Sequence, residues 1–156
     1  MQIIIHTDGA AQGNPGKGGY GVVLQAGKHY KEISQGYKYS TNNRMELLAV
    51  IVGLEAIKLE QSSVLIVSDS KYVVDSVEKK WVFGWEKKKF AKKKNPDLWA
   101  RFLIVYRKQK VSFKWIKGHA GHPLNERCDV LAVNAANSSD LLVDEYYETI
   151  GSKLKD

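Results

Sequence analysis

The chain opens on Gln2-Ile3-Ile4-Ile5-His6-Thr7-Asp8-Gly9, an apolar run that ends on a carboxylate and a glycine. Three consecutive β-branched residues predict a strand covered on both faces, as in an α/β fold. Asp8 departs from that pattern, because a carboxylate at the end of a buried strand loses hydration and needs a positive or hydrogen-bonding partner. A turn cap through Gly9 would explain Asp8 alone, whereas a bound cation would explain it together with further carboxylates.

Composition predicts a single domain without a membrane segment. The chain has 156 residues, and 44% of them are hydrophobic, which is enough to bury a core without disulfides. The sequence contains no run of eighteen apolar residues and no signal-peptide pattern before the first strand. The lone Cys128 agrees with a reducing compartment. We therefore expect a cytoplasmic protein, and a monomer because no sequence feature demands a second subunit.

The positive charge is concentrated in one segment. The formal net charge is +7, and residues 79–94 hold eight lysines against one acid, Glu86, while the rest of the chain is balanced. A solvated face or a nuclear targeting signal would explain a lysine run by itself. The segment also contains the aromatic residues Trp81, Phe83, Trp85 and Phe90. Flat side chains among cations are typical of surfaces that follow phosphates, so we expect this segment to bind nucleic acid.

Hydrophobic periodicity predicts five strands and four helices. The strands are expected at 2–9, 20–25, 30–38, 64–68 and 111–116. The helices are expected at 45–59, around 72–77, from Asp97 through 105, and at 124–136. A hairpin signal at Ala26-Gly27-Lys28 makes the first three strands an antiparallel meander. The crossover helix makes the fourth strand parallel to the first and adjacent to it.

Three further carboxylates occur in similarly apolar settings. Glu46 is the only polar side chain of an apolar helix segment and shares a stripe with Val50, although an acid in a first turn also favours the helix dipole. Asp69 follows a buried strand, as Asp8 does, so the two should lie side by side at one sheet edge unless Asp69 serves only as a helix cap. Asp129 lies on the last predicted helix.

This crowding of acids favours a metal site. Carboxylates brought together without a cation raise one another's pKa and cost stability, and hard divalent ions relieve both effects. The sequence has no Cys/His cluster of zinc spacing, whereas carboxylates and water suit Mg²⁺ or Mn²⁺. A shared cluster suits two ions about 4 Å apart, an arrangement used in phosphodiester hydrolysis.

The sequence closely resembles type 1 ribonuclease H over residues 1 to about 136. The motifs that carry the resemblance are Thr7-Asp8-Gly9 with Gly13-Asn14-Pro15-Gly16, Thr41-Asn42-Asn43-Arg44-Met45-Glu46-Leu47, Ser68-Asp69-Ser70, and Trp115-Ile116-Lys117-Gly118-His119 with Asn125-Glu126-Arg127-Cys128-Asp129. The resemblance implies an α/β ribonuclease H-like fold, in which a mixed five-stranded sheet is flanked by helices. It also implies hydrolysis of the RNA strand of RNA–DNA hybrids to 5′-phosphate and 3′-hydroxyl ends.

The resemblance implies a role for each acidic residue. Asp8, Glu46, Asp69 and Asp129 would be ligands of two Mg²⁺ ions, with Mn²⁺ as a substitute, and Glu46 would also touch a ribose 2′-hydroxyl. His119 resembles a mobile histidine that assists proton transfer or product release, a role that suits a pKa near neutrality.

The resemblance also implies a set of substrate contacts. Asn14, Asn42 and Asn43 would read 2′-hydroxyls and base edges in the minor groove, because amides both donate and accept hydrogen bonds, and Thr41 would help to hold a DNA phosphate. Residues 79–94 resemble a basic protrusion that grips the DNA strand. Its contacts would include Trp81, Trp85, Lys87, Lys88 and Lys89.

Two alternative functions fit part of the pattern. A non-catalytic module that binds RNA–DNA hybrids or double-stranded RNA would explain the fold and the basic segment, but it need not keep four carboxylates and His119. A DNA-directed nuclease or transposase of the same fold should lack the paired asparagines. On either reading residues 1–136 form the functional domain. Residues 137–156 are expected to be a polar C-terminal tail, with a short helix as an option at 141–150.

Overall fold

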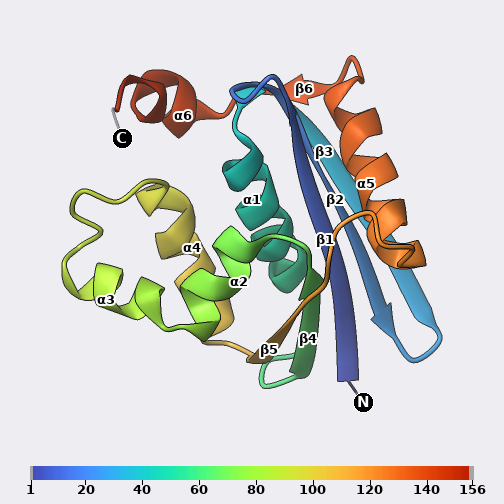
Figure 1. The fold of residues 1–156 in the computed structure, drawn as a ribbon. Coiled ribbons are helices and arrows are strands. Elements are labelled where there is room, and N and C mark those ends of the chain that lie inside the picture. The colour runs from blue at the N-terminus through green and yellow to red at the C-terminus, as the bar shows by residue number, and fades with distance from the viewer. Residues whose placement is uncertain (1, 155–156) are drawn as a thin grey trace.

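The computed structural model describes residues 2–154, which form one mixed sheet with helices on both faces (Figure 1). The sheet has the strand order β5-β4-β1-β2-β3-β6. Its strands are β1 (Gln2–Gln12), β2 (Gly16–Ala26), β3 (His29–Ser40), β4 (Ser63–Ser68), β5 (Lys110–Trp115) and β6 (Leu141–Leu142). Strands β1, β2 and β3 form an antiparallel meander, and β4 runs parallel to β1 beside it. These features confirm the predicted α/β sheet.

The sheet differs from the prediction at one edge and in one turn. Strand β6, a sixth strand, pairs in parallel with β3 at Gly36 and Tyr37, and its two residues are too short to show a strand pattern in the sequence. Strand β1 continues through Gln12 where a turn was expected from Gly9 onward. Position 9 requires glycine because helix α1 packs directly against it: an added Cβ would lie 2.4 Å from the Glu46 backbone nitrogen.

The helices divide between the two faces of the sheet. They are α1 (Asn42–Glu55), α2 (Lys71–Glu78), α3 (Trp81–Lys87), α4 (Pro96–Tyr106), α5 (Pro123–Ala136) and α6 (Glu145–Thr149), followed by a 3-10 turn at Gly151–Lys153. Helix α1 packs on β1 and β2 with α4 behind it, and α5 crosses the opposite face (Figure 1). Within residues 2–154, no helix combines the length and apolar character needed to cross a bilayer.

Four helix termini differ from the sequence expectation. Helix α1 is capped by Thr41 and begins at Asn42, before the expected start at 45, and it ends at Glu55, before the expected end at 59. Ser70, not Asp69, caps α2 and accepts a hydrogen bond from the Val73 amide at 3.2 Å. Asn95 occupies the N-cap position of α4, and Asp97 lies within the first turn of that helix instead. Asp69 is therefore not needed as a helix cap.

Helix α5 lies unusually close to the sheet. A Cβ added to Gly21 of β2 would lie 2.3 Å from the Cys128 carbonyl oxygen, and one added to Gly19 would lie 2.3 Å from that of Ala132. The absence of side chains at these two positions thus sets the distance between α5 and β2. Since α5 carries Asp129, this distance also sets how deeply that carboxylate reaches toward β1.

Gly21→Ala should lower the free energy of unfolding by roughly 1–3 kcal/mol, because α5 must move away from the sheet. Gly84→Ala is the control, since a Cβ there meets no atom within 4 Å and alanine favours the α3 helix. Urea unfolding of both variants tests the prediction. Equal stability of the two variants would contradict this account of the α5 packing.

Candidate active site

Three carboxylates meet where β4 ends beside the middle of β1. Asp8 is 7% exposed and Glu46, from the first turns of α1, is 6% exposed. The two strands are parallel, and Thr7 pairs with Ser68. Asp8 and Asp69, which follow these two residues, therefore lie side by side. One carboxylate oxygen from each of Asp8, Glu46 and Asp69 lies within 4.8 Å of the others. This geometry agrees with the side-by-side placement predicted from the two strands.

Asp129 stands outside this group of three. It lies on α5, partly exposed, and approaches Asp8 from the opposite face of the sheet to α1. Its charge still contributes to raising the pKa of Asp8. The structure therefore gathers three of the four predicted ligands closely and places the fourth at the margin of the cluster.

The pKa values of two acids in the cluster are raised, as expected for buried carboxylates that repel one another. Burial, followed by the charge of Asp69, raises the pKa of Asp8 to about 8. Burial, followed by the charges of Asp8 and Asp69, also raises the pKa of Glu46 well above its usual value. The Glu46 Oε1 atom is buried and has no hydrogen-bond partner among the described residues. A buried acid with an unsatisfied oxygen beside two further carboxylates fits the donor set that a hard divalent cation requires.

The loop after β5 closes over Asp69. A Cβ added to Gly118 would lie 2.6 Å from the Asp69 Oδ2 atom, so a side chain there would force the Asp69 carboxylate to move. The Trp115 indole nitrogen donates a hydrogen bond to the Asp69 carbonyl oxygen at 3.0 Å. His119 follows on this loop with an exposed side chain and a φ of 55°. The loop thus carries His119 past the acidic cluster, whereas His122 occupies the N-cap position of α5.

The predicted groove-reading residues lie together at the start of α1. The Asn14 Oδ1 atom accepts a hydrogen bond from the Asn42 amide at 3.0 Å, which ties the β1–β2 turn to the helix. The Thr41 hydroxyl caps α1 by accepting from the Arg44 amide at 3.2 Å. Asn14, Thr41 and Asn43 also line a cavity of about 320 Å³. The structure therefore brings these four predicted residues into one surface region.

The two tryptophans of the basic segment differ in exposure. The Trp81 side chain is 48% exposed, with the Lys79 Nζ atom 5.3 Å from its ring centroid. The Trp85 ring is half-buried, because it packs edge-on against Trp99 with centroids 5.8 Å apart. The Lys93 Nζ atom lies 5.4 Å from the Trp85 ring. Trp81 is thus accessible to a ligand, whereas much of Trp85 belongs to the core.

Lys87, Lys88 and Lys89 are all exposed at the end of α3 and just after it. They project from a segment that bulges away from the sheet beside α4 (Figure 1). By contrast, a cavity of about 910 Å³ lies at the other end of the sheet, where Ile3 and Leu59 contribute to its lining. None of the predicted site residues lines it.

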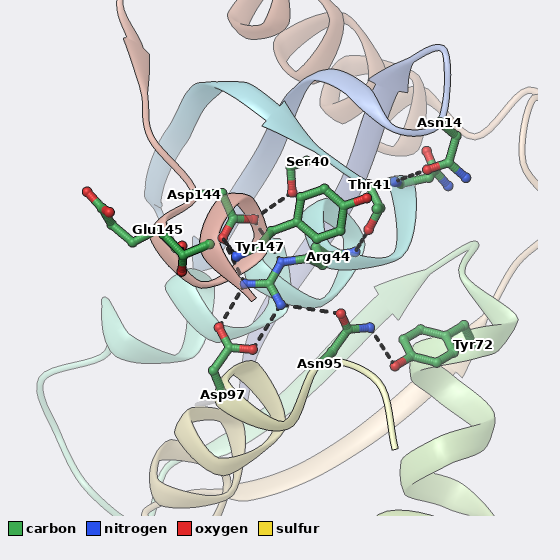
Figure 2. A network of polar contacts seen from close by, with 12 residues as sticks. Asn14, Ser40, Thr41, Arg44, Tyr72, Asn95, Asp97, Asp144, Glu145 and Tyr147 are labelled. Atoms are coloured by element: carbon green, nitrogen blue, oxygen red, sulfur yellow. Dashed lines mark hydrogen bonds and ion pairs between the residues drawn. The ribbon is translucent and has the colours of Figure 1, made fainter. Parts of the chain in front are cut away.

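Sequence reasoning assigned no role to a second charged cluster, which Figure 2 shows beside the groove-reading residues. Arg44 is only 2% exposed and forms ion pairs with Asp97 at 2.7 Å and Asp144 at 2.8 Å. Fifty-three and one hundred residues separate Arg44 from these two partners. The only signal in the sequence was an arginine inside the first turn of an apolar helix.

Comparison with known proteins identifies relatives along nearly the whole chain. The RNase H family model matches residues 1–137. A ribonuclease H from Syntrophus aciditrophicus is 50% identical over 151 residues, which cover 94% of this chain and 87% of that protein. A ribonuclease H from Desulforamulus reducens is 52% identical over 148 residues, which cover 92% of each chain.

Two solved structures are also similar. The crystal structure of LC9-RNase H1, described as a type 1 RNase H with the type 2 active-site motif, has a TM-score of 0.79 at 29% identity. It covers 98% of this chain and 82% of its own. The structure of LC11-RNase H1 in complex with an RNA/DNA hybrid has a TM-score of 0.64 at 27% identity, and covers 86% of this chain and 96% of its own.

Asp8→Asn should stabilise the metal-free protein at neutral pH. The pKa of Asp8 rises from 3.8 to about 8 on folding, so the unfolded chain loses this proton first as the pH increases. The carboxyl therefore lowers stability increasingly between about pH 4 and pH 8, and Asn removes that cost. The free energy of unfolding should increase by more than about 1 kcal/mol at pH 7.5 in EDTA, and little at pH 4.

Urea unfolding at the two pH values measures the effect, with Asp140→Asn at an exposed position as the control. Addition of Mg²⁺ should reduce the difference, because ions that bind the native carboxylates stabilise the unmodified protein. An Asp8→Asn variant no more stable than the unmodified chain at pH 7.5 would show that the Asp8 carboxyl is not strained by its neighbours.

Proposed function

We propose that this chain, which belongs to the ribonuclease H family, is an endoribonuclease that hydrolyses the RNA strand of RNA–DNA hybrids. The observation that carries the proposal is the cluster of Asp8, Glu46 and Asp69, three buried or partly buried acids within 4.8 Å of one another. A purely binding module would pay the electrostatic cost of this cluster without using it. The products would be 5′-phosphate and 3′-hydroxyl ends.

Asp8, Glu46, Asp69 and Asp129 would hold two Mg²⁺ ions, with Mn²⁺ able to replace them. When bound, the ions supply an activated water and stabilise the oxygen that leaves the phosphorus. The buried acids Asp8 and Glu46 keep the donor set rigid, since their strand and helix are packed in the core. Asp69 and Asp129 are partly exposed, so a phosphodiester would reach their carboxylates from solvent. The raised pKa of Asp8 and Glu46 supports the assignment, because cations and protons compete for the same oxygens.

His119 would assist proton transfer or product release from its position on the loop that passes Asp69. Its side chain is exposed and projects from a backbone segment flanked by Gly118 and Gly121. Neutral imidazole accepts a proton and imidazolium donates one near physiological pH, so a loop histidine serves either step. The close approach of Gly118 to Asp69 supports this role, since it fixes the base of the loop beside the carboxylates.

Recognition of the hybrid would use two surfaces, one that reads the minor groove and one that follows the DNA strand. Asn14, Asn42 and Asn43 would read the minor groove, where amides can pair with 2′-hydroxyls and base edges, while Thr41 holds a DNA phosphate. The exposed lysines 87–89 and Trp81 would follow the DNA strand. Trp85 would act mainly by supporting this surface, because its ring packs against Trp99.

The catalytic domain would comprise residues 1–136 and act as a monomer in the cytoplasm. The family match over residues 1–137 supports this boundary. The segment after it contains β6 and α6, which pack on the domain near β3.

The proposed function predicts metal-dependent cleavage of the hybrid alone. A labelled RNA strand annealed to DNA should be cut in Mg²⁺ and left intact in EDTA, while matched RNA–RNA and DNA–DNA duplexes stay whole. Asp8→Asn should abolish cleavage and leave hybrid binding largely intact. Binding without cleavage by the unmodified chain, in Mg²⁺ and in Mn²⁺, would instead identify a non-catalytic hybrid-binding module.

Replacing Lys87, Lys88 and Lys89 with alanine should weaken hybrid binding and flatten its salt dependence. Each lost phosphate contact should reduce the log–log slope by roughly 0.9, the value for duplex DNA. Fluorescence anisotropy between 50 and 200 mM salt, about the range in which such contacts change affinity strongly, measures the slope. Lys28→Ala, at an exposed position in the β2–β3 turn, is the control and should leave it unchanged. The same slope for the triple variant would remove this segment from the substrate path.

A further inference from the structure

The second charged cluster joins three separate parts of the chain at one guanidinium. Arg44 from α1 donates to Asp97 at the start of α4 and to Asp144, which precedes α6 (Figure 2). Its Nη1 atom also lies 3.3 Å from the Asn95 Oδ1 atom. These contacts use each of the five N–H groups of the arginine. The side chain therefore has a single arrangement with no donor left over.

Asp144 is equally saturated. Its Oδ2 atom accepts from the Ser40 hydroxyl at 2.7 Å and from the Arg44 Nε atom at 2.8 Å. Its Oδ1 atom accepts from the Arg44 Nη2 atom at 2.9 Å and from the Tyr147 amide at 3.3 Å, which caps α6. The Tyr146 ring lies 5.2 Å from the centre of the guanidinium. A buried residue thus fixes the C-terminal segment to α1, in addition to the pairing of β6 with β3.

The cluster reaches both proposed nucleic-acid surfaces. On one side, Arg44 follows directly on Thr41, Asn42 and Asn43 in the first turn of α1. On the other side, Asn95 ends the basic segment and its Nδ2 atom donates to the Tyr72 hydroxyl at 3.0 Å. That hydroxyl also accepts from the Trp99 indole at 2.9 Å.

Trp99 in turn packs against Trp85 of α3. A continuous set of contacts therefore runs from the C-terminal segment to the groove-reading residues and to the basic helix.

The C-terminal segment also forms part of the surface itself. Tyr146, Tyr147 and Ser152 line the 320 Å³ cavity together with Asn14 and Thr41. One wall of this cavity therefore comes from residues beyond the family match, which ends at residue 137. Loss of the Asp144 contacts would release this wall and the hydrogen-bonding partners of Arg44 together.

We propose that Asp144, acting through Arg44, is a positioning residue. It holds the groove-reading residues and the basic segment in the relative position in which both can bind the same hybrid. This inference rests on the proposed function, and it concerns a segment that contains none of the proposed catalytic residues. Asp144 is buried between the end of β3, where it accepts from Ser40, and α1, and it touches no member of the acidic cluster in the contacts given above. Its effect should therefore fall on substrate binding and not on the chemical step.

The test is steady-state cleavage of a hybrid by Asp144→Asn, a variant of nearly the same shape that removes the charge. KM should rise about three- to tenfold while kcat changes less than about twofold, in the range observed for residues that couple two sites. Glu55→Gln is the charge-matched control, because it removes a carboxylate paired with Arg101 on the exposed side of α1. It should leave KM unchanged or slightly lower.

A second control separates positioning from loss of stability. Leu54→Ala removes a core side chain that is 2% exposed and lowers stability without touching the Arg44 cluster. Measured at a temperature where every variant is folded by circular dichroism, it should keep the KM of the unmodified chain. Tyr146→Leu serves where Asp144→Asn does not fold, since it removes the ring beside Arg44 but keeps both carboxylates, and its KM should also rise.

The outcomes distinguish the inference from the proposed function. An unchanged KM for Asp144→Asn, or for Tyr146→Leu in its place, would overturn the positioning role, as would an equal rise in KM for Leu54→Ala. A fall in kcat with constant KM would overturn it as well, because the chemical step would then depend on Asp144. Failure of the unmodified chain to cleave any hybrid would refute the proposed function itself.

Discussion

The mutual repulsion of Asp8, Glu46 and Asp69 is the constraint on which the rest of the structure depends. Three acids within 4.8 Å, two of them almost completely buried, oppose folding unless protons or cations neutralise them. The surrounding core must offset that cost. Strand β1 lies inside the sheet between β2 and β4, and both α1 and α5 pack on it, so the strand that carries Asp8 is held from every side.

The same constraint explains the separation of charge along the chain. The acidic cluster lies where β4 ends beside β1, whereas eight of the twenty lysines gather in residues 79–94, which bulge from the domain beside α4 (Figure 1). Lysines paired with the carboxylates would compete with metal ions. Lysines concentrated on a separate segment can instead attract a polyanion.

Hydrophobic periodicity in the sequence was sufficient to predict where three of the acidic residues lie. Asp8 and Asp69 each follow an apolar run in the sequence, and parallel pairing of those runs brings them together. The apolar stripe containing Glu46 correctly indicated burial. Periodicity could not locate the end of α1, because residues 56–59 favour a helix and only the return of the chain to β4 ends it. Nor could it reveal the partners of Arg44, since Asp97 and Asp144 look like surface acids until the fold brings them in from distant positions.

Two groups of acidic residues lie around the start of α1, and they differ in how their charges are compensated. Asp97 and Asp144 share the fully paired Arg44, whereas Glu46, two residues later, keeps an oxygen without a partner among the described residues. Arg44 cannot neutralise Glu46 as well, because all five of its N–H groups are already engaged. Because Asp97, Asp144 and Asn95 occupy every N–H group of Arg44, this arginine does not pair with the acidic cluster of Asp8, Glu46 and Asp69. An acidic site that is buried, rigid and without an internal cation is the environment in which divalent ions compete best with protons for carboxylate oxygens.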